Sequence, residues 1–159
     1  MRRTFAVVAI LALCLACNKK HSADKVTYVA DDDPRMNAAI DKARTTVNNF
    51  IVALKSRKAG QTQFSVKMAV TDGKHVEHMW LFPVTFDGKR FRGPINNDPE
   101  LVKHVKIDQE MSVDSSQISD WMYVENGKLV GGYTLRVLRD AMSSAERAEF
   151  DRSVPFTVD

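Results

Sequence analysis

The sequence has only two cysteines, Cys14 and Cys17, and both lie near its start. No thiol follows position 17, so disulfides, cysteine-based zinc sites and cysteine nucleophiles are excluded for the rest of the chain. We therefore expect the folded part to hold together by packing alone. About 125 residues suffice for this, because domains of that size bury well over half of the surface that the unfolded chain exposes.

Excess charge of either sign is also lacking. The chain has 23 Lys and Arg against 20 Asp and Glu, a net charge of +3. Without Arg2 and Arg3 the balance is 21 against 20, or +1. Proteins that bind nucleic acids depend on a surplus of Lys and Arg facing phosphates. We therefore expect no nucleic acid among the partners.

No hydrophobic run is long enough to span a bilayer. The longest, residues 5–16, has twelve apolar residues. As a helix it would measure about 18 Å, whereas a bilayer core is about 30 Å thick. A short basic head at Arg2 and Arg3 precedes it, which is the layout of an export signal. We expect residues 1–16 to be a signal peptide.

The stretch CLAC, residues 14–17, resembles the processing box of bacterial lipoproteins, although Cys14 stands where that box usually has leucine. The resemblance implies that Cys17 is lipidated and becomes the mature N-terminus. Two or more acyl chains provide a lasting hold on a membrane. Asn18 after the cysteine implies the outer membrane, facing the periplasm, where the cell has one. The alternative is an ordinary cleaved signal with a soluble product.

Residues 18–33 are polar and show no sustained periodicity, which indicates a flexible tether with a short strand at residues 26–29. Such a tether has an end-to-end distance of roughly 20 Å. We therefore divide the chain into a signal peptide, a lipidated N-terminus with its tether (residues 17–33), and a single α+β domain (residues 34–159).

The domain opens with a pattern typical of a long helix. Asp33 is a suitable N-cap, Pro34 suits the first helical position, and Gly60 marks the end. Apolar residues recur at spacings of three and four along one face: Met36, Ile40, Ala43, Val47, Phe50, Ile51 and Leu54. This predicts an amphipathic helix that packs on a sheet.

After Gly60 the apolar period changes to two, which predicts a hairpin around Asp72 and Gly73. A two-residue turn would split the apolar residues between the two faces. A three-residue turn places Phe64 opposite Trp80 and gathers them on one face. We favour the second register, which points His78 and Trp80 inward.

His75 and His78 are three residues apart, a spacing that suits a metal site on a helix. In a strand, however, positions i and i+3 point to opposite faces. The two histidines therefore do not chelate in this prediction, and we expect neither a metal nor another cofactor. His78 is either a core or rim histidine or a polar residue that lines a cleft.

The remaining signals complete an α+β fold. Asp87-Gly88 and Asn126-Gly127 predict tight hairpin turns. Asp98 is expected to cap a short helix that begins at Pro99, and Ser143 with Glu146 predicts a capping box for a last helix. The predicted fold is α+β: a long N-terminal helix packed on a curled antiparallel meander, like a small barrel, with short C-terminal helices.

Three segments carry a resemblance to a known family: EHMW at residues 77–80, FRGPINNDP at 91–99, and ISDWMYVENGKLVGGYTLRVL at 118–138. They resemble the YegJ-like family of bacterial proteins, a domain of unknown function, over roughly residues 35–150. The resemblance implies a bacterial and often exported protein. It implies no particular activity.

Polar and amphipathic residues near the ends of predicted elements are the candidate site. They are Glu77, His78, Asp120, Trp121, Tyr133 and Arg136. Arg136 paired with Asp120 or Glu77 would explain these charges structurally, and ligand binding would explain them as well.

Two functions remain open. The first is a membrane-tethered envelope module that binds a protein partner or a small ligand. The alternative is a metal-free hydrolase in which His78 acts as base with Glu77 or Asp120 as the orienting carboxylate. The sequence has no G-x-S-x-G elbow, phosphate loop or dinucleotide fingerprint, so the hydrolase rests on loose histidines and carboxylates.

Overall fold

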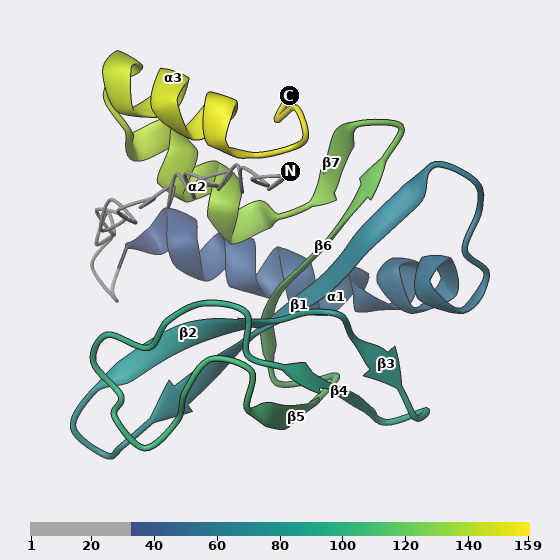
Figure 1. Cartoon of the computed structure of the whole chain (residues 1–159), viewed down its shortest axis with the longest axis vertical. Helices are drawn as coiled ribbons and strands as arrows, with labels where there is room; N and C mark the ends of the chain where they lie inside the picture. Colours follow the sequence, from purple (N-terminus) through teal and green to yellow (C-terminus); the bar gives the residue numbers. More distant parts are fainter. Residues whose placement is uncertain (1–32) are drawn as a thin grey trace, which may run out of the picture.

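The computed structural model describes residues 33–159. Four predicted features lie outside the described residues: the signal peptide, the lipidation site at Cys17, the strand at 26–29 and the tether up to residue 32. The elements follow in the order α1 (Pro34–Lys55), β1 (Gln61–Thr71), β2 (Val76–Leu81), β3 (Thr85–Phe86), β4 (Arg90–Pro94), β5 (Glu110–Asp114), β6 (Ile118–Glu125), β7 (Lys128–Gly131), α2 (Tyr133–Ala141) and α3 (Ser144–Ser153) (Figure 1).

The strands form two antiparallel sheets. One sheet has the order β2-β1-β6-β7 and the other has the order β3-β4-β5. An isolated bridge between Leu81 and Ile95 connects β2 with the end of β4. The predicted α+β class is confirmed. The sheets do not close into a small barrel, because β6 returns to pair with β1 while β5 pairs with β4 in the separate sheet.

Helix α1 supplies the centre of the hydrophobic core. The Asp33 carboxylate accepts a hydrogen bond from the backbone N–H of Arg35, and proline occupies the first turn. Phe50 is fully buried, and its ring centroid lies 5.6 Å from that of Phe91 and 5.5 Å from that of Trp121. Aromatic rings at these separations attract one another beyond the burial of their area. Phe50 thereby joins α1 to both sheets.

The four-stranded sheet has two unlike faces. The core face carries Val66, Met68, Met79, Leu81 and Trp121, all buried. It packs against α1 and the three-stranded sheet. The polar face, which alternate residues of the same strands form, carries Lys67, Ala69, His78, Trp80 and Asp120.

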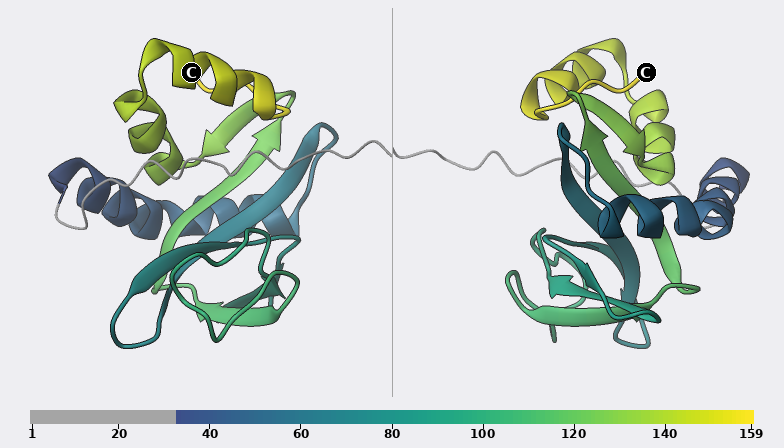
Figure 2. Two further views of the ribbon diagram at one scale, coloured as in Figure 1. Left: turned by 60° about the vertical axis from the view of Figure 1, so that its left-hand side comes forward. Right: turned by 90° about the vertical axis from the view of Figure 1, so that its right-hand side faces the viewer.

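Residues 33–159 cover the polar face at only one end. Val124, Leu129 and Phe156 form a second buried cluster there, with Leu135 of α2 and the C-terminal segment packed against it. Figure 2 shows α2 and α3 at this end of the molecule and the three-stranded sheet at the opposite end. Near β2 the polar face bears exposed and half-buried side chains: Ala69, Val76, His78 and Trp80. We call these four residues the open surface.

The predicted register of the first hairpin is wrong. Val66 lies opposite Leu81, and Lys67 lies opposite Trp80. Four residues, 72–75, form the loop, because the Asp72 carboxylate accepts hydrogen bonds from the backbone N–H groups of Lys74 and His75 at 2.9 and 2.7 Å. The longer loop reverses the faces, so His78 and Trp80 point away from the core. A slip of an odd number of residues moves every side chain of a strand to the other face.

The short helix predicted at Pro99 is also wrong. Residues 96–109 form an irregular loop without helix. Its backbone N–H groups at Glu100, Leu101 and Val102 donate to the Glu77 carboxylate instead. A carboxylate from β2 thereby takes the donors that a capped helix would have offered to Asp98.

The two later turns and the capping box are confirmed, whereas the first helix ends at Lys55 and not at Gly60. Phe86 pairs with Phe91 across the Asp87-Gly88 turn, and Glu125 pairs with Lys128 across the Asn126-Gly127 turn. Asn126 and Gly127 both have positive φ, as the two central residues of a tight hairpin turn require. Helix α3 begins with the complete capping box of Ser143 and Glu146. These features depend on residues close together in the sequence.

Candidate functional site

The polar face contains a buried network of three polar side chains from three elements. Lys67 on β1 donates from Nζ to Thr134 Oγ1 at the start of α2, over 3.1 Å. Thr134 Oγ1 donates in turn to Asp120 Oδ2 on β6, over 2.6 Å. Lys67 is 9% exposed, Thr134 2% and Asp120 not at all. The site forms because β1 lies beside β6 and α2 begins over β6.

Asp120 also caps helix α2. Its Oδ1 atom accepts from the backbone N–H groups of Trp121 (2.8 Å) and Tyr133 (3.1 Å), and Oδ2 accepts from the N–H of Thr134 (2.8 Å). With the Thr134 hydroxyl the carboxylate accepts four hydrogen bonds. The N-cap position itself is Gly132, which has no side chain to offer. Asp120 therefore supplies the negative charge and the acceptors that a helix N-terminus favours.

Lys67 lies between a carboxylate and an aromatic ring. Its Nζ atom is 5.1 Å from the centroid of the Trp80 ring, a cation–π distance. Burial lowers the pKa of Lys67, and the negative charge of Asp120 opposes this. Burial likewise raises the pKa of Asp120, although the hydrogen bonds from Thr134 and the positive charge of Lys67 act to lower this pKa. Desolvation penalises the charged form of each group.

His78 lies beside this network. Its Nδ1 atom is 2.8 Å from Ser119 Oγ, a hydrogen-bonding distance. The His78 residue is exposed, whereas Ser119 is buried and only 2% exposed. Sequence reasoning did not single out Ser119, which a register shift between β1 and β6 brings to this position. A nucleophile must reach its substrate, so the burial of this hydroxyl disfavours a Ser119–His78 hydrolase.

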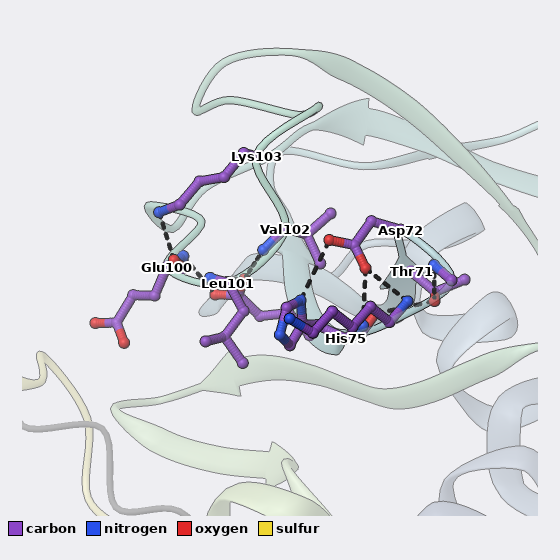
Figure 3. A network of polar contacts seen from close by, with 10 residues as sticks. Thr71, Asp72, His75, Glu100, Leu101, Val102 and Lys103 are labelled. Carbon is purple, nitrogen blue, oxygen red and sulfur yellow. Dashed lines mark hydrogen bonds and ion pairs between the residues drawn. The ribbon is translucent and has the colours of Figure 1, made fainter.

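Glu77 performs a different task from the one predicted. Its carboxylate accepts from the backbone N–H groups of Glu100 (2.8 Å), Leu101 (2.9 Å) and Val102 (3.1 Å). Burial alone would raise the pKa of Glu77, but these three donors lower it below its ordinary value. The Lys103 ammonium donates to the backbone carbonyl of Glu100 in the same loop (Figure 3). Glu77 thus anchors the loop to β2.

Trp121 and Tyr133 are packing residues in the described fold. The Trp121 ring is 2% exposed, and its Nε1–H donates to the backbone carbonyl of Ala43 over 3.0 Å. Tyr133 is half-buried and meets Trp121 edge-on at 5.5 Å. Its hydroxyl accepts from Thr46 on α1. The Trp121 ring therefore does not line an open groove.

Arg136 pairs with neither Asp120 nor Glu77, so the predicted ion pair is wrong. Its guanidinium donates to the backbone carbonyls of Leu129 (2.9 Å), Gly131 (3.0 Å) and Asp159 (2.8 Å). The rigid fork of arginine suits several carbonyls at once. Arg136 thereby holds β7 and the end of the chain to α2.

Lys67 and Trp80 were missed as site residues by the sequence analysis. Lys67 alternates with apolar residues as any solvent-facing strand residue does, and nothing local marks it as buried. The only signal was its predicted strand position next to the Asp-Gly hairpin. Its hydrogen-bond partner Thr134 and its acidic neighbour Asp120 come from α2 and β6, more than fifty residues later in the sequence.

Residues 33–159 contain neither a metal-binding cluster nor a membrane-spanning helix. No group of three or more His, Cys, Asp or Glu side chains is arranged to hold a metal ion within this range. None of the helices in the same part of the chain is long and apolar enough to cross a membrane.

Comparison with known proteins places the fold in a family. The family described as "Uncharacterized protein conserved in bacteria (DUF2314)" matches residues 33–157. The chain belongs to this family. The match covers all three helices and both sheets, so Lys67, Asp120 and Thr134 lie within the family domain.

Two relatives extend the comparison. The uncharacterized protein YegJ of Escherichia coli K12 is 39% identical over 104 residues, which cover 65% of this chain and 67% of YegJ. A putative ankyrin repeat protein of Neisseria meningitidis serogroup B is 34% identical over 134 residues, which cover 79% of this chain and 53% of that protein. This chain thus spans about half of the length of the second relative. No solved structure matches the chain.

Proposed function

We propose that this DUF2314 protein is a lipid-anchored envelope protein whose folded part binds a protein partner through the open surface. In this proposal acyl chains on Cys17 hold the protein at a bacterial membrane. Residues 18–33 then connect the anchor to α1. The binding surface consists of Ala69, Val76, His78 and Trp80, with Lys67 at its inner edge.

The observation that carries the binding role is the contrast between the two ends of the polar face. One end is covered by α2 and the C-terminal segment, which bury Val124, Leu129 and Phe156. The other end exposes half of Val76 and keeps Trp80 only half-buried. Exposed aromatic and aliphatic side chains next to polar groups are typical of interaction sites.

The hydrolase alternative has less support. Both predicted orienting carboxylates hold backbone N–H groups: Glu77 anchors the loop at residues 100–102, and Asp120 caps α2. The hydroxyl at 2.8 Å from His78 Nδ1 belongs to the buried Ser119. A base, a nucleophile and an orienting acid must converge on an accessible point for acyl transfer. This arrangement does not provide one.

A photocrosslinking experiment tests the binding role. A photoreactive amino acid replaces Val76 on the open surface, and the matched control replaces Val52, which is 65% exposed on α1. Both variants are expressed in the native bacterium and irradiated. We expect a discrete adduct from position 76 that position 52 does not give. Identical adducts from both positions, or none, would contradict the proposal.

The anchor is tested separately with the two cysteines. Cys17→Ser should move the protein from the membrane fraction to the soluble fraction, because the acylated residue is lost. Cys14→Ser is the matched control and should leave the membrane association unchanged. If Cys17→Ser stays in the membrane fraction, the lipid anchor is wrong.

A further inference from the structure

The Lys67 ammonium has more donors than the described fold uses. An ammonium group donates up to three hydrogen bonds. Thr134 Oγ1 takes one of them, and the Trp80 ring faces the group at 5.1 Å. Asp120 does not accept a further hydrogen bond from Lys67, because its two oxygens already accept four hydrogen bonds from Trp121, Tyr133 and Thr134. A donor of Lys67 therefore remains for an acceptor from outside residues 33–159.

Charge decides which kind of acceptor suits this donor. The negative charge of Asp120 acts on Lys67 and compensates its positive charge within the buried network. An anionic ligand would bring a second negative charge into a site where burial already penalises charge. A neutral carbonyl oxygen satisfies the donor without that cost. The site therefore favours a neutral acceptor over a carboxylate.

The residues around Lys67 indicate which kind of ligand contains this carbonyl group. Trp80 is half-buried and lies directly opposite Lys67, so its ring offers a flat apolar surface next to the donor. Ala69, the next residue on the same face of β1, is small and exposed. Val76 and His78 continue the surface along β2. A planar amide fits beside a tryptophan ring, and an extended chain fits along two strands.

We propose that Lys67 and Trp80 bind a backbone amide of an extended peptide segment, with Lys67 Nζ donating to the amide carbonyl and Trp80 packing against the amide plane. This inference rests on the proposed function, because it names the chemical group through which the protein partner is held. The buried network has a role in this arrangement. Thr134 and Asp120 orient the ammonium group, so one of its N–H donors points toward the position of the peptide carbonyl.

NMR titration of the full chain tests the inference with two probes. The first is a capped dipeptide, N-acetyl-alanyl-alanine N-methylamide, which carries only neutral amides. The second is sodium acetate, which carries only an anionic acceptor. The readouts are the indole N–H of Trp80 and the ε-methylene signals of Lys67. The indole N–H of Trp121, which donates to Ala43 in the core, reports whether each variant is folded.

We expect the capped dipeptide to shift both readouts saturably and acetate to leave them in place. Lys67→Met should weaken the dipeptide response roughly tenfold or more, since a hydrogen bond from a charged donor is lost. Lys128→Met, which changes an exposed lysine on β7, is the matched control and should respond like the wild type. Trp80→Ala leaves the buried network intact and should also weaken the dipeptide response.

Two outcomes would overturn the inference. Saturable shifts with acetate but not with the dipeptide would make Lys67 an anion site. No shift with either probe would mean that an ordered water alone satisfies Lys67. If the adduct at position 76 persists in either case, the binding role stands and only the amide inference fails. If the adduct is also missing, both proposals fail.

Discussion

The Thr134 hydroxyl donates to the Asp120 carboxylate over 2.6 Å and at the same time accepts from Lys67 Nζ over 3.1 Å. One threonine thus connects an acid on β6 with a base on β1, and both are buried. Buried charges are retained only where partners compensate the loss of hydration. The stability of the protein should therefore depend unequally on the members of this network.

Asp120→Ala should lower the free energy of unfolding by about 3–5 kcal/mol, because it leaves Lys67 buried without its countercharge and three backbone N–H groups without an acceptor. Lys67→Met should cost less than half as much, since Asp120 keeps its four hydrogen bonds. Urea denaturation at pH 7 measures both. Glu149→Ala, at an exposed acid on α3, should stay within about 0.5 kcal/mol of the wild type. A greater loss for Lys67→Met than for Asp120→Ala would refute this order.

Glu77→Gln should make the stability of the protein less dependent on pH in the acid range. The pKa of Glu77 is lowered in the folded state, so its carboxylate stabilises the fold above the unfolded value of about 4.3 and loses this effect as the pH falls. The difference in free energy of unfolding between wild type and variant should therefore shrink between about pH 5 and pH 3. Denaturation curves across this range measure it. Glu110→Gln, at an exposed glutamate on β5, is the matched control.

The same Glu77→Gln substitution should loosen the loop that Glu77 holds. A neutral amide oxygen replaces two carboxylate oxygens, so the amides of residues 100–102 lose charge-assisted acceptors. We expect their hydrogen exchange to accelerate, while exchange in β6 stays unchanged. Unchanged protection of these three amides would mean that the loop is held by other contacts.

Arg136→Lys should release the end of the chain. A lysine ammonium does not reproduce the fork with which Arg136 reaches the carbonyls of Leu129, Gly131 and Asp159. We expect a loss of about 1–3 kcal/mol in stability and faster digestion by carboxypeptidase. The matched control is Arg152→Lys, at an exposed arginine near the end of α3. Equal digestion of both variants would argue against the clamp.

Gly131→Ala should be far more destabilising than Gly73→Ala, although both glycines have positive φ. An added Cβ at Gly131 would lie 2.4 Å from the Trp121 carbonyl oxygen and 2.5 Å from its ring, whereas the Cβ at Gly73 meets nothing within 4 Å. The backbone term is about 1–2 kcal/mol in both cases. We expect Gly131→Ala to lose at least about 3 kcal/mol in total, because overpacking adds to it. Thermal unfolding compares the two, and similar losses would refute the steric argument.

The sequence by itself determined the features that depend on neighbouring residues. The turns at Asp87-Gly88 and Asn126-Gly127 follow from residues that accept positive φ, and the capping box follows from Ser143 and Glu146 three positions apart. The change of apolar period at Gly60 indicated the α+β class. Each of these signals acts within one or two turns of chain, where local chemistry has no strong competitor.

Only the tertiary structure decided where the charged side chains lie and what they hold. The hairpin register depended on the Asp72 carboxylate, which lengthened the loop to four residues. Glu77 accepts hydrogen bonds from the N–H groups that would have begun a helix at Pro99. Arg136 donates to backbone carbonyls and not to Asp120. Lys67 is buried because β6 lies beside it and the start of α2 packs against it. A polar side chain binds whichever acceptor the packed strands bring within about 3 Å, and that neighbour comes from chain far away in sequence.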